Sequence, residues 1–117
     1  MDRNELFSQV AQRYGVAPEY PWPRWPEHAV LRHTGNRKWF GIVMSVPASR
    51  LGLAGDGAVD VINVKADPDD VPALQLADGI LPAYHMNKEH WVSVLIEGDV
   101  PDEMLLDLLE TSHRLTS

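Results

Sequence analysis

The stretch HAVLRHTGNRKWFGIVMSV, residues 28–46, decides the fold of this chain. Two mainly apolar runs flank a short polar segment that contains Gly35 and Asn36, and this pattern is typical of two β-strands joined by a tight turn. Gly followed by Asn suits a two-residue type II′ turn. The sequence therefore predicts an antiparallel hairpin with strands over residues 28–33 and 37–46.

A two-residue turn also sets the register of this hairpin, and with it the two faces. Pairing Leu31 with Phe40 puts both on one side, where Ala29, Ile42 and Met44 join them to form the expected core face. Pairing Arg32 with Trp39 puts these two on the opposite side, which is mixed in character and also receives Val30, Gly41 and Val43.

The remaining elements follow from spacing and from end signals. Residues 3–14 carry apolar residues at helical intervals between a capping pair, Asp2 and Glu5, and a terminating Gly15. The alternate prolines of residues 18–26 exclude a helix there and predict an extended crossover from helix to sheet.

Two further strands are expected over residues 59–65 and 91–96, with loops over residues 47–57 and 79–87. A helix is expected to start at Asp67-Pro68, late or kinked because of Pro72. The final helix opens at Pro101, with a buried stripe of Leu105, Leu108, Leu109 and Leu115.

This element order predicts one α+β domain over residues 1–117, a two-layer sandwich of an antiparallel sheet with helices on one face. The most buried residues are expected to be Leu6, Val10, Leu31, Phe40, Ile42, Ile62, Val64, Val94, Leu105 and Leu108.

Composition narrows the class of protein. The chain has 117 residues, 44% of them hydrophobic, and no apolar run near the ~20 residues of a membrane helix, so we expect a soluble, cytoplasmic monomer with no membrane role. The absence of cysteine excludes disulfides, thiolate metal sites and cysteine nucleophiles. The net charge is −7, yet residues 20–50 carry +4 and residues 51–117 carry −10. This bipolar pattern has two interpretations. It either orients a charged partner or only reflects acidic helices that are well solvated.

Signatures of catalysis and of cofactor binding are missing from the sequence. His85 and His90 are five residues apart, as are His28 and His33, and neither spacing matches a metal motif. The acidic run that starts at Asp67 lacks the spacing of a calcium loop, which leaves weak divalent binding as a minor alternative. We therefore expect no catalytic residues, no metal and no cofactor.

Several segments, in order along nearly the whole chain, resemble the MmcQ/YjbR-like proteins. They are EYPW from Glu19, VKADP from Val64, GILPAYHMNKEHW from Gly79 and VPDE from Val100, together with the hairpin around Gly35. The resemblance implies a CyaY-like, frataxin-type α+β fold. It also implies a role as a DNA-binding "double-wing" module, a label that rests on fold analogy.

Three function classes follow: a nucleic-acid-binding module by resemblance, a non-catalytic domain that binds a protein or a small ligand, and an enzyme with an unrecognised site. Because the helices cover one face of the sheet, we expect the open face to bind the partner, either DNA or a protein. A non-catalytic binding domain could use the acidic helices instead. Strand parity predicts a platform of Arg32, Trp39, Asn63, Lys65, Trp91 and Ser93, with a rim of His85, Asn87 and Lys88. The alternative is that the tryptophans form a minor core beneath Trp22 and Trp25.

Overall fold

The chain folds into one antiparallel sheet with two long helices on the same face, so the α+β two-layer sandwich is confirmed. The computed structural model describes residues 1–117. In chain order the elements are α1 (Arg3–Tyr14), β1 (Ala29–Arg32), β2 (Trp39–Pro47), the 3-10 turn η1 (Ala48–Leu51), β3 (Ala58–Lys65), α2 (Val71–Leu74), β4 (Ile80–Pro82), β5 (Trp91–Leu95) and α3 (Asp102–Thr116). The strands lie in the order β1-β2-β3-β5-β4.

The ends of α1 are formed by the residues that the sequence indicated. Asp2 accepts a hydrogen bond from the Glu5 N–H at 2.9 Å, and Gly15 ends the helix in the left-handed region at φ 64°. The chain terminus is tied to the other long helix, because the Met1 ammonium donates to Asp102 Oδ1 at 3.0 Å. Both long helices are therefore fixed at the same corner of the molecule.

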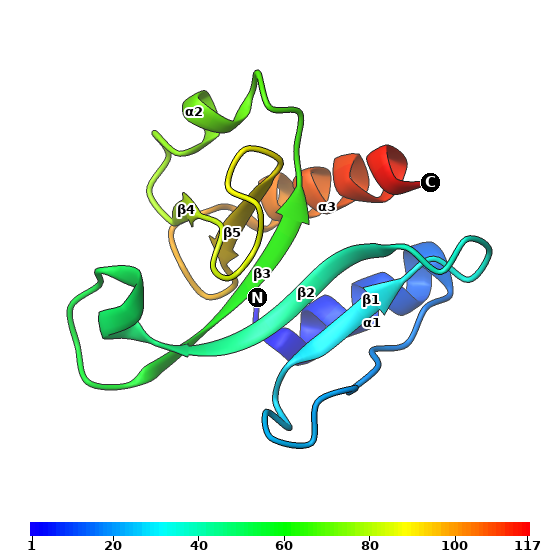
Figure 1. Ribbon diagram of the computed structural model, residues 1–117, viewed down its shortest axis with the longest axis horizontal. Helices are drawn as coiled ribbons and strands as arrows, with labels where there is room; N and C mark the ends of the chain where they lie inside the picture. The colour runs from blue at the N-terminus through cyan, green and yellow to red at the C-terminus, as the bar shows by residue number, and fades with distance from the viewer.

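The core lies between the sheet and the helices α1 and α3, which Figure 1 shows behind the sheet. Leu6 and Val10 of α1 and Leu105 and Leu109 of α3 are almost fully buried there. Nine of the ten residues predicted to be most buried are buried, but Leu108 is only half-buried. Leu115, predicted in the same stripe, is exposed because it lies in the last turn of α3.

The predicted pairing of the hairpin is correct at Arg32, which lies opposite Trp39, and wrong at Leu31, which lies opposite Gly41. Phe40 is therefore an extra residue, a β-bulge in β2. A bulge shifts the alternation of side chains by one residue. As a result Val43 belongs to the core, whereas Ile42 and Met44, predicted for the core face, line a cavity on the opposite face.

The position next to the bulge has almost no room for a side chain, and Gly41 fits there because it has none. A Cβ atom on Gly41 would lie 3.1 Å from Leu31 Cδ1 and 3.3 Å from Ile62 Cδ1. Both are core atoms, so the close approach of β2 to its neighbours depends on glycine.

The turn of the hairpin is longer than the predicted two residues. The His33 N–H donates to the Lys38 carbonyl at 2.9 Å, and Arg37 takes a left-handed φ of 65°. The cause lies in α3, because Asn36 Nδ2 donates to the Thr116 carbonyl and Asn36 Oδ1 accepts from the Lys38 N–H, both at 2.9 Å.

A buried serine of α3 joins the two central strands where they separate. Regular pairing of β2 with β3 ends at Ile42 and Asn63. Beyond that point Ser112 Oγ donates to the Phe40 carbonyl at 2.6 Å and accepts from the Lys65 N–H at 2.8 Å. The hydroxyl therefore replaces the missing bonds of the ladder next to the bulge.

One short element, β4, differs from the prediction, and the helix α2 starts late, as the prediction allowed. Within the predicted loop 79–87, β4 pairs with β5 and forms one edge of the sheet. A three-residue strand that ends in Pro82 is too short to show alternation, and an edge strand tolerates proline. The helix expected from Asp67 begins only at Val71, after a turn in which Asp67 Oδ1 accepts from the Asp69 N–H. No helix of the chain has the length and the apolar character that crossing a membrane requires.

Candidate functional site

A cavity of about 390 Å³ lies on the side of the sheet that α1 and α3 leave uncovered. Its walls come from three parts of the chain: the proline-rich crossover before β1, the strand β2 with η1, and the loop after β4. The lining residues are Trp22, Trp25, His28, Trp39, Ile42, Met44, Arg50, Tyr84, His85 and Met86.

Aromatic rings form one wall of this cavity, which we call the aromatic cavity. The rings of Trp22 and Trp39 meet edge to face, with centroids 5.8 Å apart and an angle of 87°. The ring of Trp25 lies parallel to that of His28, at 4° and 6.2 Å between centroids. Trp25 is 53% exposed, so its face is available to a ligand from the solvent.

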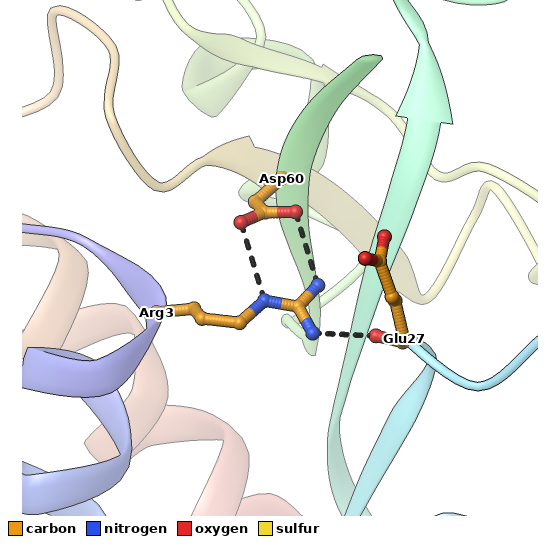
Figure 2. Close-up of polar contacts among 3 residues, drawn as sticks. All are labelled: Arg3, Glu27 and Asp60. Carbon is orange, nitrogen blue, oxygen red and sulfur yellow. Dashed lines mark hydrogen bonds and ion pairs between the residues drawn. The ribbon is translucent and has the colours of Figure 1, made fainter.

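The crossover is held against the sheet at both ends. Near its start, Glu19 pairs with Val30 of β1 through two backbone hydrogen bonds of 3.0 and 2.8 Å. Near its end, Arg3 of α1 donates to the Glu27 carbonyl at 2.6 Å and forms a two-pronged ion pair with Asp60 of β3, at 3.0 and 3.2 Å (Figure 2). These contacts fix the tryptophans and His28 in place.

The opposite wall is fixed by a buried network beneath Tyr84. The Tyr84 N–H donates to Ser93 Oγ and the Tyr84 carbonyl accepts from Asn63 Nδ2, both at 2.9 Å, and Ser93 Oγ donates to Asn63 Oδ1. Asn63 and Ser93 are fully buried. Two strand side chains therefore hold the backbone of the loop, and His85 follows in a left-handed conformation at φ 57°.

The floor of the cavity is a consequence of the bulge in β2. Ile42 and Met44 face the cavity because Phe40 shifts the alternation of side chains. Asn63 Nδ2 lies 3.7 Å from Met44 Sδ, so the floor also contacts the network that holds the loop.

The electrostatics of the cavity are set by its three basic side chains, His28, Arg50 and His85, because no carboxylate lines it. Burial lowers the pKa of His28, and the nearby Arg3 and His85 act in the same direction, while Glu27 opposes them. His28 is therefore a neutral imidazole at pH 7, with one donor and one acceptor nitrogen.

The residues of the predicted platform do not lie together on one surface. Trp39 and His85 line the aromatic cavity. Arg32 lies behind it, 5.5 Å above the Trp39 ring, with its Nε 3.4 Å from Glu19 Oε1. Asn63, predicted as part of an open surface, is buried beneath the loop instead, because it satisfies the Tyr84 backbone.

Other residues of the predicted platform and rim are also buried or lie outside the aromatic cavity. Ser93 is buried with Asn63, and Lys65 and Trp91 pair across β3 and β5 away from the cavity. Asn87 Oδ1 accepts from two backbone N–H groups of its own turn, and Lys88 donates to the Ala83 carbonyl at 2.8 Å.

Eight of the ten lining residues were not among the predicted site residues. For Trp22 and Trp25 a signal existed, namely two tryptophans between prolines. Trp22 contacts Trp39 as the alternative interpretation expected, but Trp25 stacks on His28 and Trp91 lies outside the cavity. Ile42 and Met44 were missed because the bulge has no mark in the hydrophobic pattern. Three or more histidine or acidic side chains are nowhere grouped as a metal site would require.

Comparison with known proteins places this architecture in a family. Residues 11–115 match the family described as YjbR. The chain is 42% identical to the uncharacterized protein YyaQ of Bacillus subtilis, over 99% of this chain and 98% of the relative. It is 32% identical to the uncharacterized protein YbdF of Escherichia coli O157:H7, over 98% and 87% of the two chains.

Solved structures show the same relationship. A crystal structure of a protein from Pseudomonas syringae superposes with a TM-score of 0.98, at 41% identity and with full coverage of both chains. A Deinococcus radiodurans protein with domain DUF419 superposes with a TM-score of 0.72, at 26% identity over 96% of this chain and 75% of that one. The resemblance predicted from the ordered segments is therefore confirmed, and the chain belongs to the YjbR family.

Proposed function

We propose that this protein is a non-catalytic binding domain whose aromatic cavity takes up the flat ring of a small molecule. The observation that carries the proposal is the convergence of Trp22, Trp25, Trp39 and Tyr84 on one cavity from three separate chain segments. Its volume of about 390 Å³ lies within the range of small-molecule sites, roughly 300–1,000 Å³.

The polar groups of the cavity support binding over catalysis. Covalent catalysis most often uses a serine, threonine, cysteine, lysine or carboxylate nucleophile beside a base. The cavity is lined by no serine, threonine, lysine or carboxylate. Its two imidazoles and one guanidinium can donate to a ligand, which suits recognition.

The test uses 2-naphthamide, a neutral flat probe, and the four tryptophan indole N–H signals in a nitrogen-15 correlation spectrum. Signals of Trp22, Trp25 and Trp39 should shift on titration, while that of Trp91, which lies outside the cavity, should stay in place. Trp25→Ala should weaken binding by about 1 kcal/mol or more, as loss of a stacking partner does.

Tyr20→Ala is the matched control, because Tyr20 is equally exposed in the same segment and does not line the cavity. Both substitutions should leave the fold intact, since both side chains are about half exposed. If no indole signal moves, or if Trp91 moves with the others, the cavity is not the binding site.

Single-stranded DNA is a second candidate, favoured by the position of the cavity in the basic part of the chain. Arg24 and Arg50 are exposed and make no ion pair. Arg24 directly precedes Trp25 in the chain, and Arg50 lies at the wall of the cavity. A base stacked in the cavity would bring its phosphates to these arginines. The net charge of −7 disfavours coating of duplex DNA.

Salt dependence distinguishes the two candidates. Affinity for an oligothymidylate should fall steeply between low and physiological salt if phosphates contribute, because binding releases counterions. Affinity for 2-naphthamide should not change. Trp39→Phe should weaken both, whereas Lys65→Ala should weaken neither, since Lys65 lies away from the cavity.

A further inference from the structure

The basic side chains of the aromatic cavity indicate the charge of its ligand. Aromatic rings alone would suit an organic cation as well as a flat neutral ring, because the face of a tryptophan attracts positive charge. A cation site also requires acidic groups or at least the absence of fixed positive charge nearby. Here the lining contains Arg50 and two histidines and no carboxylate.

Arg50 is free to bind an anion. Arg3, Arg13, Arg32 and Arg37 each lie within 4.0 Å of a carboxylate oxygen of the protein. Arg50, in η1 at the wall of the cavity, has no hydrogen bond and no ion pair with its side chain. An unpaired guanidinium can form two parallel hydrogen bonds with a carboxylate or a phosphate.

His28 supplies a second polar group in the same cavity. Its Nδ1 atom is buried and has no hydrogen-bond partner, and its other neighbours are the rings of Trp22 and Trp25. A buried nitrogen without a partner is unfavourable in the ligand-free protein. Binding of a polar ligand group at this wall would relieve that cost directly or by a small rotation of the ring.

We propose that the ligand of the aromatic cavity is an anion, a flat ring that carries a carboxylate or a phosphate, with the ring between the tryptophans and the anionic group on Arg50. This inference rests on the proposed function, because it requires the cavity to be the binding site. It adds the charge of the ligand and the residue that selects it.

The test compares three probes that share one ring system: 2-naphthamide, 2-naphthoate and 2-naphthyl phosphate. We expect one or both anions to bind about tenfold more tightly than the neutral amide, the effect of a charge-assisted contact. The better of the two anions identifies the group that Arg50 takes. A cationic probe with the same ring, (2-naphthylmethyl)trimethylammonium, should bind most weakly.

Arg50→Gln should remove the preference for the anions, and it should weaken binding of 2-naphthamide much less than binding of the anions. Arg114→Gln, a change of an exposed arginine on α3, is the matched control and should preserve the preference. Equal affinities for amide and anions, tightest binding of the cation, or a preference that survives Arg50→Gln would overturn this inference alone. Failure of all probes to move the cavity indole signals would overturn the proposed function as well.

Discussion

Ser93→Ala is expected to destabilise the protein and to loosen one wall of the cavity. The Ser93 hydroxyl accepts from the Tyr84 N–H at 2.9 Å and donates to Asn63 Oδ1, and it is fully buried. Alanine leaves both partners without a hydrogen bond. Each buried polar group left unpaired costs about 1–3 kcal/mol, and the Tyr84 N–H is partly accessible to water, so we expect a loss of about 2–3 kcal/mol.

Urea unfolding measures this loss, with Ser45→Ala as the control. Ser45 lies on β2, is half-buried, and makes no side-chain hydrogen bond, so its replacement should change the free energy of unfolding by less than about 0.5 kcal/mol. The urea midpoint should fall for Ser93→Ala with little change in the slope. Binding of 2-naphthamide should weaken too, because Tyr84 loses its support.

A double-mutant cycle with Asn63→Ala tests whether the three groups act as one network. Removal of either side chain already disrupts the support of Tyr84, so the double variant should lose less than the sum of the two single losses, by about 0.5–3 kcal/mol. If Ser93→Ala costs no more than Ser45→Ala, or if the two losses simply add, the buried network does not hold the loop.

Three further predictions concern the contacts between helices and sheet. Ser112→Ala should lower the free energy of unfolding by about 2–3 kcal/mol, measured by urea unfolding, since it leaves two backbone groups of the central strands unpaired; an equal loss for the exposed Ser8→Ala would contradict this. Arg3→Met should cost about 1–3 kcal/mol and shift the Trp22 and Trp25 indole signals, because it frees the end of the crossover; Asp60→Asn should have a smaller effect on those signals. Stability should fall as the pH drops below about 6.5, because burial and the neighbouring His33 lower the pKa of His113 in the folded protein, so the unfolded chain takes up the proton first; unfolding midpoints between pH 7.5 and 5 should show a shallower fall for His113→Gln.

Local signals in the sequence predicted the elements of this fold other than β4, because their causes are local. Asp2 and Gly15 end α1 through contacts within four residues, and the composition on both sides of Gly35 requires a hairpin. The side-chain pattern in residues 59–65 and 91–96 similarly marks the two strands observed as β3 and β5. Element type follows from such short-range chemistry, and the sandwich follows from the element order.

The details that shape the cavity depend on contacts distant in the sequence. Asn36 lengthens the turn because it reaches Thr116, eighty residues further along the chain. Asn63 and Ser93 show the parity of an open face, yet the loop after β4 covers them. Strand parity predicts the direction of a side chain but not what lies above it, and so the platform was only partly identified.

The bulge at Phe40 links the two faces of the sheet. On the helix side its carbonyl accepts from Ser112, and a Cβ atom on Gly41 would lie only about 3 Å from core atoms. On the other side the same bulge turns Ile42 and Met44 into the floor of the aromatic cavity. A regular strand at this position would bury those two side chains against the helices and turn Val43 outward. The register that satisfies the core and the register that forms the cavity are therefore one and the same, so a substitution that removes the bulge must alter the aromatic cavity together with the core.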